Sequence, residues 1–369
     1  MKNSSHISTA IDEKFWLGRR VLVTGHTGFK GSWLCIWLQS LGADLVGYAL
    51  GPPSGPNLYT LGGVSDDMID QRADVRDLNS LVAAIRDHSP EIVFHLAAQA
   101  FVRLSYEKPE ETYGTNIMGT VNLLEAVRQV GGVRAIVIVT SDKCYENLES
   151  LKGYREIDRM GGRDPYSSSK GCAELVVAAF RHSYFSGNDS FTQIASARAG
   201  NIIGGGDWGV DRLIPDMVKA FNLRKTAMIR YPDAIRPWQH VLEPIAGYLI
   251  LARNLVIDGG NFAEGWNFGP SSAGEQTVRY LADTMAKIWG DDAHWEIDGE
   301  DQPHEARYLQ LDVTKSESYL GWRSHLDLHK TLELTVDWYR KWERGENMRA
   351  VTVCQIQDYV EKMRDKVIS

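Results

Sequence analysis

Residues 20–31 read RVLVTGHTGFKG, an apolar run followed directly by three regularly spaced glycines. The run RVLVT predicts a buried strand over residues 20–24, and the pattern after the glycines predicts a helix from about residue 27 to 41. Gly25, Gly28 and Gly31 have the spacing GxxGxxG. The first glycine admits positive φ, the second lets a pyrophosphate approach the backbone, and the third lets the helix pack closely on the strand. We therefore predict a dinucleotide-binding turn, with an ordinary glycine-rich turn as the alternative.

Further short apolar runs alternate with helical patterns along the first half of the chain. Strands are predicted at 44–49, 92–96 and 135–140, and helices near 78–86 and 112–130. Strands that are apolar throughout and separated by helices indicate a parallel sheet that is covered on both faces. With right-handed crossovers, this predicts an α/β fold with a Rossmann-type doubly wound parallel sheet.

The pattern becomes less regular after about residue 200, where glycine and proline interrupt it more often. We expect a loose tail over residues 1–14 and a dinucleotide-binding domain over 15–200. Residues 201–369 are expected to form mainly a smaller C-terminal substrate-binding lobe, interleaved with the last strands of the sheet.

Composition argues against nucleic acid, a membrane or a metal ion as a partner of this chain. The 369 residues carry a net charge of −8 with acids and bases interspersed, which disfavours nucleic acid as a partner. No apolar stretch approaches 18 residues and the first residues contain no signal-peptide pattern, so no membrane association and a cytoplasmic location are expected. The four cysteines are scattered without zinc spacing, so no metal is expected.

The second strand bears on the choice of dinucleotide. It ends Gly47-Tyr48-Ala49-Leu50, and no acid follows before Asp66 to hold the ribose hydroxyls. Residues 31–71 contain no lysine or arginine, so a 2′-phosphate lacks its usual cationic partner there, with Lys30 as the one exception nearby. This favours NAD over NADP.

Three segments are candidates for contact with the cofactor. Asp74 and Val75 are placed to lie near the adenine, and the alternative for Asp74 is a turn or cap acid. The strand end with Leu96, Ala97 and Ala98 has small residues that a cofactor can approach, and a tight helix–strand contact is the alternative. The turn itself contributes Gly25, His26, Thr27, Gly28, Phe29 and Gly31.

A second group of residues carries chemistry. The strand near 135–140 ends in Ser141-Asp142-Lys143, at the edge of the sheet that faces the ligand crevice. Tyr166 and Lys170 are four residues apart on one face of a predicted helix. The lysine is expected to lower the pKa of the tyrosine, so that the phenolate takes a proton from an alcohol while hydride leaves to NAD. The alternative is a solvated helix face.

The combination of GxxGxxG, Ser141 and the Tyr166/Lys170 pair resembles the extended short-chain dehydrogenase/reductase family over nearly the whole chain. The resemblance implies that Asn116 holds the active-site end of the sheet and belongs to the cofactor site with Tyr166 and Lys170. Ser141-Asp142-Lys143 resembles the Thr-Asp-Glu of the nucleotide-sugar 4,6-dehydratases, which implies that Asp142 protonates the leaving C6 hydroxyl.

Lys143 departs from the usual glutamate. It is the C5 base only if its pKa is depressed, and orienting Asp142 or binding the C6 oxygen are the alternatives. The glycine turn and the segment TSDKCY are similar to those of the CDP-glucose 4,6-dehydratases, which implies CDP-glucose as the substrate and a homodimer or homotetramer.

The second half contains candidate substrate contacts. By the same resemblance, Asn201 and Arg236 meet the pyrophosphate, and each arginine has a surface ion pair as its alternative. The full set of substrate candidates is Asn201, Arg236, His240, Arg307 and Tyr308. Two other functions stay open: another nucleotide-sugar dehydratase or a 4-epimerase acting on a dTDP-, UDP- or GDP-sugar, and a non-catalytic NAD-binding sensor.

Overall fold

The computed structural model describes residues 11–150, 152–186, 191–270, 274–299 and 308–368. Most of the predicted N-terminal tail therefore lies outside the described residues. Residues 11–14 differ from that prediction, because the helix α1 (Glu13–Trp16) begins among them and Ile11 is buried. Asp12 caps α1 and forms an ion pair with Arg253, which fixes this segment on the protein.

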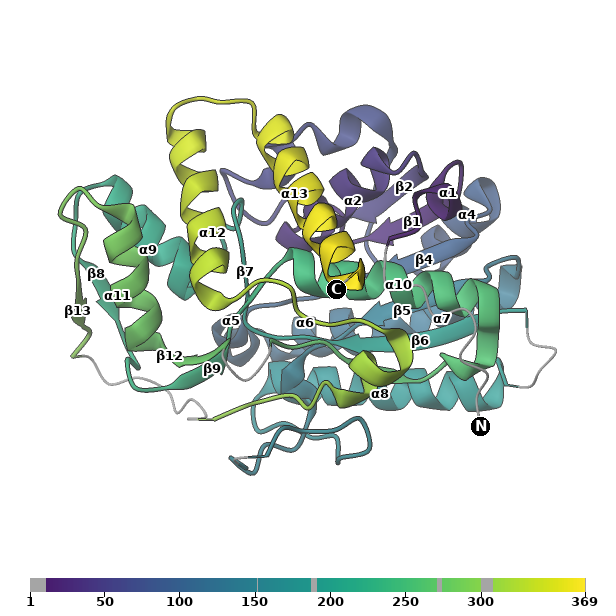
Figure 1. The fold of residues 1–369 in the computed structure, drawn as a ribbon. Coiled ribbons are helices and arrows are strands. Elements are labelled where there is room, and N and C mark those ends of the chain that lie inside the picture. Colours follow the sequence, from purple (N-terminus) through teal and green to yellow (C-terminus); the bar gives the residue numbers. More distant parts are fainter. Residues whose placement is uncertain (1–10, 151, 187–190, 271–273, 300–307, 369) are drawn as a thin grey trace.

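A seven-stranded parallel sheet forms the centre of the molecule, in the order β11-β6-β5-β4-β1-β2-β3 (Figure 1). Its strands are β1 (Arg20–Thr24), β2 (Asp44–Ala49), β3 (Ile69–Arg72), β4 (Ile92–His95), β5 (Ala135–Val139), β6 (Gln193–Arg198) and β11 (Gly265–Asn267). The strand order reverses between β1 and β4, which opens a ligand crevice at their carboxyl ends. The predicted α/β doubly wound fold is confirmed.

Helices cover both faces of the sheet. On one face lie α2 (Phe29–Ser40) and α10 (Leu242–Asp258), and α13 (Met348–Ile368) packs over α2. The other face is covered by α4 (Leu78–His88), α7 (Gly119–Val130) and α8 (Pro165–Ser183). Because α2 is enclosed between the sheet and α13, it is apolar on nearly all sides, whereas α4 is buried only along one stripe.

The predicted helix over 112–130 is divided in the structure. The short helix α6 (Pro109–Tyr113) leads into a π-helical turn, η2 (Gly114–Met118), and then into α7. A π-turn offsets the side chains of a helix by one residue, and such turns are frequent at functional sites. Asn116 lies in this turn.

A smaller lobe lies at the left of Figure 1. Its strands pair as β8 (Ala227–Ile229) with β13 (Trp295–Ile297) and β9 (Ile235–Pro237) with β12 (Glu275–Thr277). Its helices are α9 (Leu213–Asn222) and α11 (Val278–Trp289), with α12 (Leu328–Glu343) packed on α11. Between elements of this lobe, the chain forms α10 and the sheet strand β11, and it later forms α13, which packs over α2.

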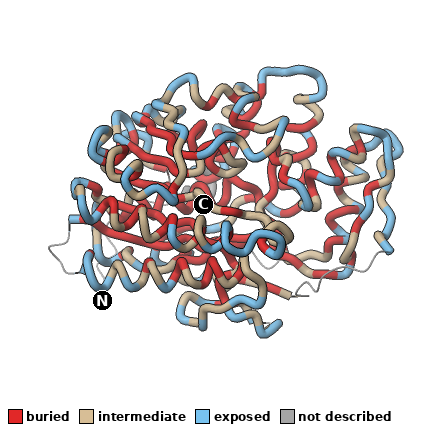
Figure 2. The backbone as a smooth tube through the Cα atoms, turned by 180° about the vertical axis from the view of Figure 1, so that it is seen from behind, coloured by how far each residue is buried: buried red, intermediate tan, exposed pale blue. Residues whose placement is uncertain are grey.

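The remaining elements are short. They are α3 (Leu58–Leu61), η1 (Val64–Asp67), α5 (Val102–Glu107), η3 (Asp142–Cys144), β7 (Ile202–Ile203), β10 (Gln239–His240), η4 (Gly259–Asn261) and η6 (Ser316–Leu320). The buried part of the backbone runs through the sheet and its inner helices and continues into the lobe (Figure 2). Within the described ranges, no helix has the length and apolar character needed to cross a bilayer.

Candidate active site

The glycine turn after β1 forms a backbone cradle at Gly25, Gly28 and Gly31, and its tight packing leaves no room for a Cβ at Gly25 or Gly31. Gly25 has φ +74°, and a Cβ there would lie 2.6 Å from the backbone nitrogen of Ala97. A Cβ on Gly31 would lie 2.1 Å from the carbonyl oxygen of Gly25. At Gly28 the nearest atom would be 3.4 Å away, and this residue caps α2 without any side-chain hydrogen bond. The first backbone N–H groups of α2 are therefore uncapped by side chains and suited to an anion.

His26 points away from this cradle. Its ring is buried, and Nε2 lies 2.7 Å from Oδ1 of Asp70 in β3. A Cβ on Gly47 would lie 2.6 Å from the ring, so β2 needs glycine there. Burial lowers the pKa of His26, while the hydrogen bond to the Asp70 carboxylate opposes this. The His26 side chain thus links the turn to β3, and only its backbone remains a candidate for contact with a cofactor.

The two other predicted cofactor segments lie at the ends of β3 and β4. Both carboxylate oxygens of Asp74 bind Arg76, at 2.6–3.1 Å, and Val75 is buried beneath Gly119. Ala97 donates its N–H to Oγ1 of Thr24 at 3.2 Å. The end of β4 is therefore in close contact with the glycine turn, which is the alternative interpretation of this segment, and Leu96 and Ala98 flank the contact.

Asn116 connects the chain after β4 to helix α8. Its Oδ1 accepts the N–H of Gln99 at 2.8 Å, and its Nδ2 donates to the Gln99 carbonyl at 3.1 Å and to Oγ of Ser169 at 2.8 Å. This geometry agrees with a residue that holds the active-site end of the sheet. Its partner Gln99 was not predicted, because no motif in the sequence includes it.

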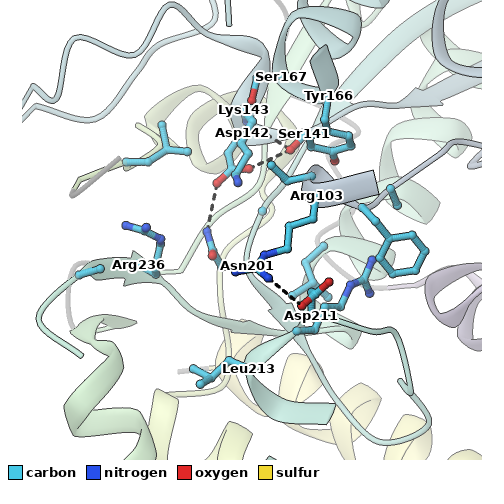
Figure 3. Close-up of a pocket in the computed structure, with 18 of the residues that line it drawn as sticks. Arg103, Ser141, Asp142, Lys143, Tyr166, Ser167, Asn201, Asp211, Leu213 and Arg236 are labelled. Carbon is cyan, nitrogen blue, oxygen red and sulfur yellow. Dashed lines mark hydrogen bonds and ion pairs between the residues drawn. The ribbon is translucent and has the colours of Figure 1, made fainter. Parts of the chain in front are cut away.

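Tyr166, Ser141 and Lys170 converge at the carboxyl end of β5. Asp164 caps α8 by accepting the N–H of Ser167 at 2.9 Å, which places Tyr166 in the first turn of the helix facing Ser141 (Figure 3). The Nζ of Lys170 lies 6.0 Å from the centroid of the Tyr166 ring.

The pKa of Tyr166 differs from the expectation. Burial raises it to about 12, and the hydrogen bond with Ser141 only partly opposes this. Burial also lowers the pKa of Lys170 to about 8. The lysine alone therefore does not make this phenol acidic, because removing both groups from water favours their neutral forms.

Asp142 is held by donors on both sides. Its Oδ1 accepts from Ser141 Oγ at 2.9 Å and its Oδ2 from Asn201 Nδ2 at 3.1 Å (Figure 3). A Cβ on Gly200 would lie 2.0 Å from the Asp142 carboxyl, so glycine is required at that position. Asn201, predicted to contact pyrophosphate, lines the pocket and donates to Asp142 in this structure. Lys143 is half-buried and lines the same pocket.

The pocket in front of these residues is rich in cations. Ser141, Asp142, Lys143, Tyr166, Asn201 and Arg236 line it, together with Lys30, Arg103, Arg212 and Arg230. Burial, with the nearby charges of Lys170 and Arg212, lowers the pKa of Lys30 to about 7. Such a pocket suits an anionic ligand despite the net negative charge of the chain.

Comparisons with known proteins agree with this geometry. The model of the GDP-mannose 4,6 dehydratase family matches residues 22–335. The chain belongs to this family. It is 53% identical to the CDP-glucose 4,6-dehydratase of Salmonella typhimurium, over 95% of this chain and 98% of that protein. The dTDP-glucose 4,6-dehydratase of Xanthomonas campestris is 27% identical, over 88% and 95%.

Solved structures show the same fold. MoeE5 in complex with UDP-glucose and NAD aligns with a TM-score of 0.74 at 25% identity, over 88% of this chain and 99% of that one. UDP-glucose 4-epimerase of Thermotoga maritima with UDP-glucose aligns with a TM-score of 0.76 at 24% identity, with the same coverage.

In this member of the GDP-mannose 4,6 dehydratase family, two predicted substrate residues do not line the described part of the pocket. His240 is completely buried with its ring 5.8 Å from that of Trp33, and it does not line the described part of the pocket. Tyr308 donates to Gln310 Oε1 at 2.8 Å and likewise does not line it. Arg307 lies outside the described residues. We leave His240 and Tyr308 out of the proposed site, because packing and hydrogen bonds within the protein already engage them.

A buried network of hydrogen bonds, which was not predicted from the sequence, lies behind the site. Glu174, two turns after Tyr166 on α8, accepts hydrogen bonds from Thr140, Ser196 and Arg198, the last at 2.7 Å. Arg198 also donates to Oη of Tyr145 at 2.6 Å. The spacing of Tyr166, Lys170 and Glu174, each four residues apart, was the available signal that Glu174 lies on the same helix face.

Proposed function

We propose that this protein converts CDP-D-glucose to CDP-4-dehydro-6-deoxy-D-glucose in an NAD-dependent dehydration, with internal hydride transfer from C4 to C6. One observation carries the proposal: Ser141, Asp142 and Tyr166 meet in one pocket. Oxidation at C4 needs a base, and loss of the C6 hydroxyl needs an acid, so a dehydratase requires both groups together. The 53% identity to a CDP-glucose 4,6-dehydratase supports the choice of sugar nucleotide.

The residues of the glycine turn fit NAD. The cradle at Gly25, Gly28 and Gly31 would hold the diphosphate through the uncapped N–H groups of α2. Asp74 and the strand end at Leu96–Ala98 would flank the adenosine, and Lys170 would bind the nicotinamide ribose. When bound, NAD would supply the hydride acceptor for oxidation at C4 and the hydride donor for reduction at C6, and its oxidised form would bring positive charge to the site.

The side chains of the pocket then divide the proton transfers. Tyr166 takes the proton of the 4-hydroxyl, with Ser141 bonded to the same oxygen. Asp142, fixed by Ser141 and Asn201, delivers a proton to the C6 oxygen as the C5 proton is removed and water leaves across C5–C6. A proton then returns to C5 when the hydride is added at C6. Lys143 lies next to Asp142 in the pocket lining, where it can bind the C6 oxygen or take the C5 proton.

Arg236 and its neighbours are the proposed diphosphate contacts. Arg236 is mostly buried and lines the pocket together with Arg103 and Arg230. A guanidinium presents paired donors to phosphate oxygens, which favours arginine over lysine at such positions.

A homodimer or homotetramer and a cytoplasmic location belong to the same proposal. Leu175 on α8 is 61% exposed and Met118 beside α7 is 50% exposed, so this outer layer offers apolar surface to a second subunit. Size-exclusion chromatography coupled to multi-angle light scattering would measure the mass of the assembly.

Incubation of the purified protein with NAD and CDP-glucose tests the function. We expect a product with the alkali-labile chromophore of a 4-keto sugar, formed from CDP-glucose faster than from dTDP-, UDP- or GDP-glucose. Tyr166→Phe should abolish it, because the phenylalanine cannot accept the hydroxyl proton. A 4-epimerase would instead give a C4 epimer without the chromophore, and a sensor would bind NAD without turnover; undiminished activity of Tyr166→Phe would refute the mechanism.

A further inference from the structure

The pocket is elongated, with its catalytic residues at one end. In Figure 3, Ser141 and Tyr166 lie at one end and Leu213 at the other, while Arg103 and Arg236 lie between them. A nucleotide sugar has the order hexose, diphosphate, ribose, base. If its hexose reaches Tyr166, as the proposed function requires, the diphosphate meets the arginines and the base lies toward Leu213.

Six carboxylates line the described part of this pocket, and neighbouring groups engage five of them. Asp142 is bound by Ser141 and Asn201, Asp164 by Ser167, Asp207 by Arg212, and Asp211 by Arg103 and Arg230, while Glu149 has an interaction of its own. The sixth is Asp216.

Asp216 lies in the first turn of α9, three residues after Leu213. Its carboxyl has no hydrogen-bond or ion-pair partner among the described residues, and its side chain is accessible from the pocket. An acid at this point of a helix normally has a lowered pKa. Asp216 is exposed at the pocket, where partial loss of hydration raises its pKa to about 6 against the opposing charge of Arg230, and the nearby charge of Asp211 adds to the rise.

We propose that Asp216 accepts a hydrogen bond from the 4-amino group of cytosine and thereby selects a cytidine nucleotide over a uridine nucleotide. The two bases differ at this edge. Cytosine presents an N–H donor at C4 and uracil presents a carbonyl acceptor. A carboxylate only accepts, so it stabilises the first base and repels the second.

Binding of CDP and UDP to the full chain with saturating NAD tests this inference without turnover. Calorimetric titration should show that the wild type prefers CDP. Asp216→Asn should reduce the CDP/UDP affinity ratio about 10- to 100-fold, because the amide nitrogen can donate to the uracil carbonyl. Asp211→Asn is the matched control: it removes a carboxylate bonded to the arginines of the same pocket and should change both affinities in the same direction, leaving the ratio within about twofold.

The outcomes separate this inference from the proposed function. If Asp216→Asn retains the wild-type ratio, or the wild type has no preference for CDP, Asp216 does not select the base. If the ratio changes as expected while the wild type fails to convert CDP-glucose, cytosine selection by Asp216 stands and the proposed reaction fails.

Discussion

Tyr166 and Asp142 show how individual residues acquire their roles from their surroundings. Tyr166 has a pKa of about 12 because it is buried, so its use as a base depends on positive charge brought beside it. Asp142 is fixed through its two oxygens by Ser141 and Asn201. The reactivity of the tyrosine therefore depends on nearby charge, whereas that of the aspartate depends on how its carboxyl is oriented.

Asp142→Asn should separate the two halves of the reaction. Oxidation at C4 does not use Asp142, so NADH should form on the enzyme, while loss of the C6 hydroxyl should slow by about 10²–10⁴-fold. Stopped-flow absorbance at the NADH band, measured with product formation, follows both steps. Asp233→Asn, in an exposed carboxylate that binds Arg279, is the control and should behave as wild type. Equal loss of NADH formation and product would contradict the role of Asp142 in dehydration.

At the scale of single elements, the turn between β1 and α2 carries two kinds of glycine. Gly31 has no room for a side chain because α2 packs against the carbonyl of Gly25, whereas a Cβ on Gly28 would make only an ordinary contact at 3.4 Å. One glycine serves packing, and the other is proposed to serve the ligand.

Substitution of Gly31 and of Gly28 by alanine should affect different properties, stability in the first case and NAD binding in the second. Gly31→Ala should destabilise the fold by about 1–3 kcal/mol, because α2 or the turn must shift. Gly28→Ala should leave the unfolding midpoint nearly unchanged and weaken NAD binding about tenfold or more, because the methyl group occupies the space of a phosphate. Thermal unfolding and fluorescence titration with NAD measure the two effects. The same loss of stability for both variants would show that Gly28 is also a packing residue.

At the scale of the whole molecule, Glu243 joins the C-terminal helix to the sheet domain. It lies in the first turn of α10, fully buried, and accepts hydrogen bonds from Tyr359 of α13, at 2.6 Å, and from Ser324, His325 and Leu326. Burial nevertheless raises its pKa to about 7. The carboxyl therefore binds its proton more tightly in the folded protein than in the unfolded chain.

This shift predicts a pH dependence of stability. A raised folded-state pKa means that the contribution of Glu243 is fully present below its unfolded value of 4.5 and is lost as pH rises through about 7. The wild type should therefore lose up to about 3 kcal/mol relative to Glu243→Gln between these pH values. Chemical unfolding of both proteins at pH 5, 6, 7 and 8 measures the difference. A constant difference across this range would show that Glu243 does not titrate between the two states.

Features that depend on residues close together in the chain could be predicted from the sequence. The glycine spacing, the apolar strands and the four-residue separation of Tyr166 and Lys170 follow from backbone periodicity, which local sequence encodes. These features were sufficient to predict the doubly wound sheet and the edge at which the pocket opens.

Contacts between side chains that are far apart in the chain became known only from the folded structure. Asn201 reaches Asp142 from 59 residues away, and His26 reaches Asp70 from 44. Burial removed His240 from the proposed site, and the position of α9 brought Asp216 into the pocket. Hydrogen-bond partners and burial depend on how distant segments pack, and no local pattern of residues specifies that packing.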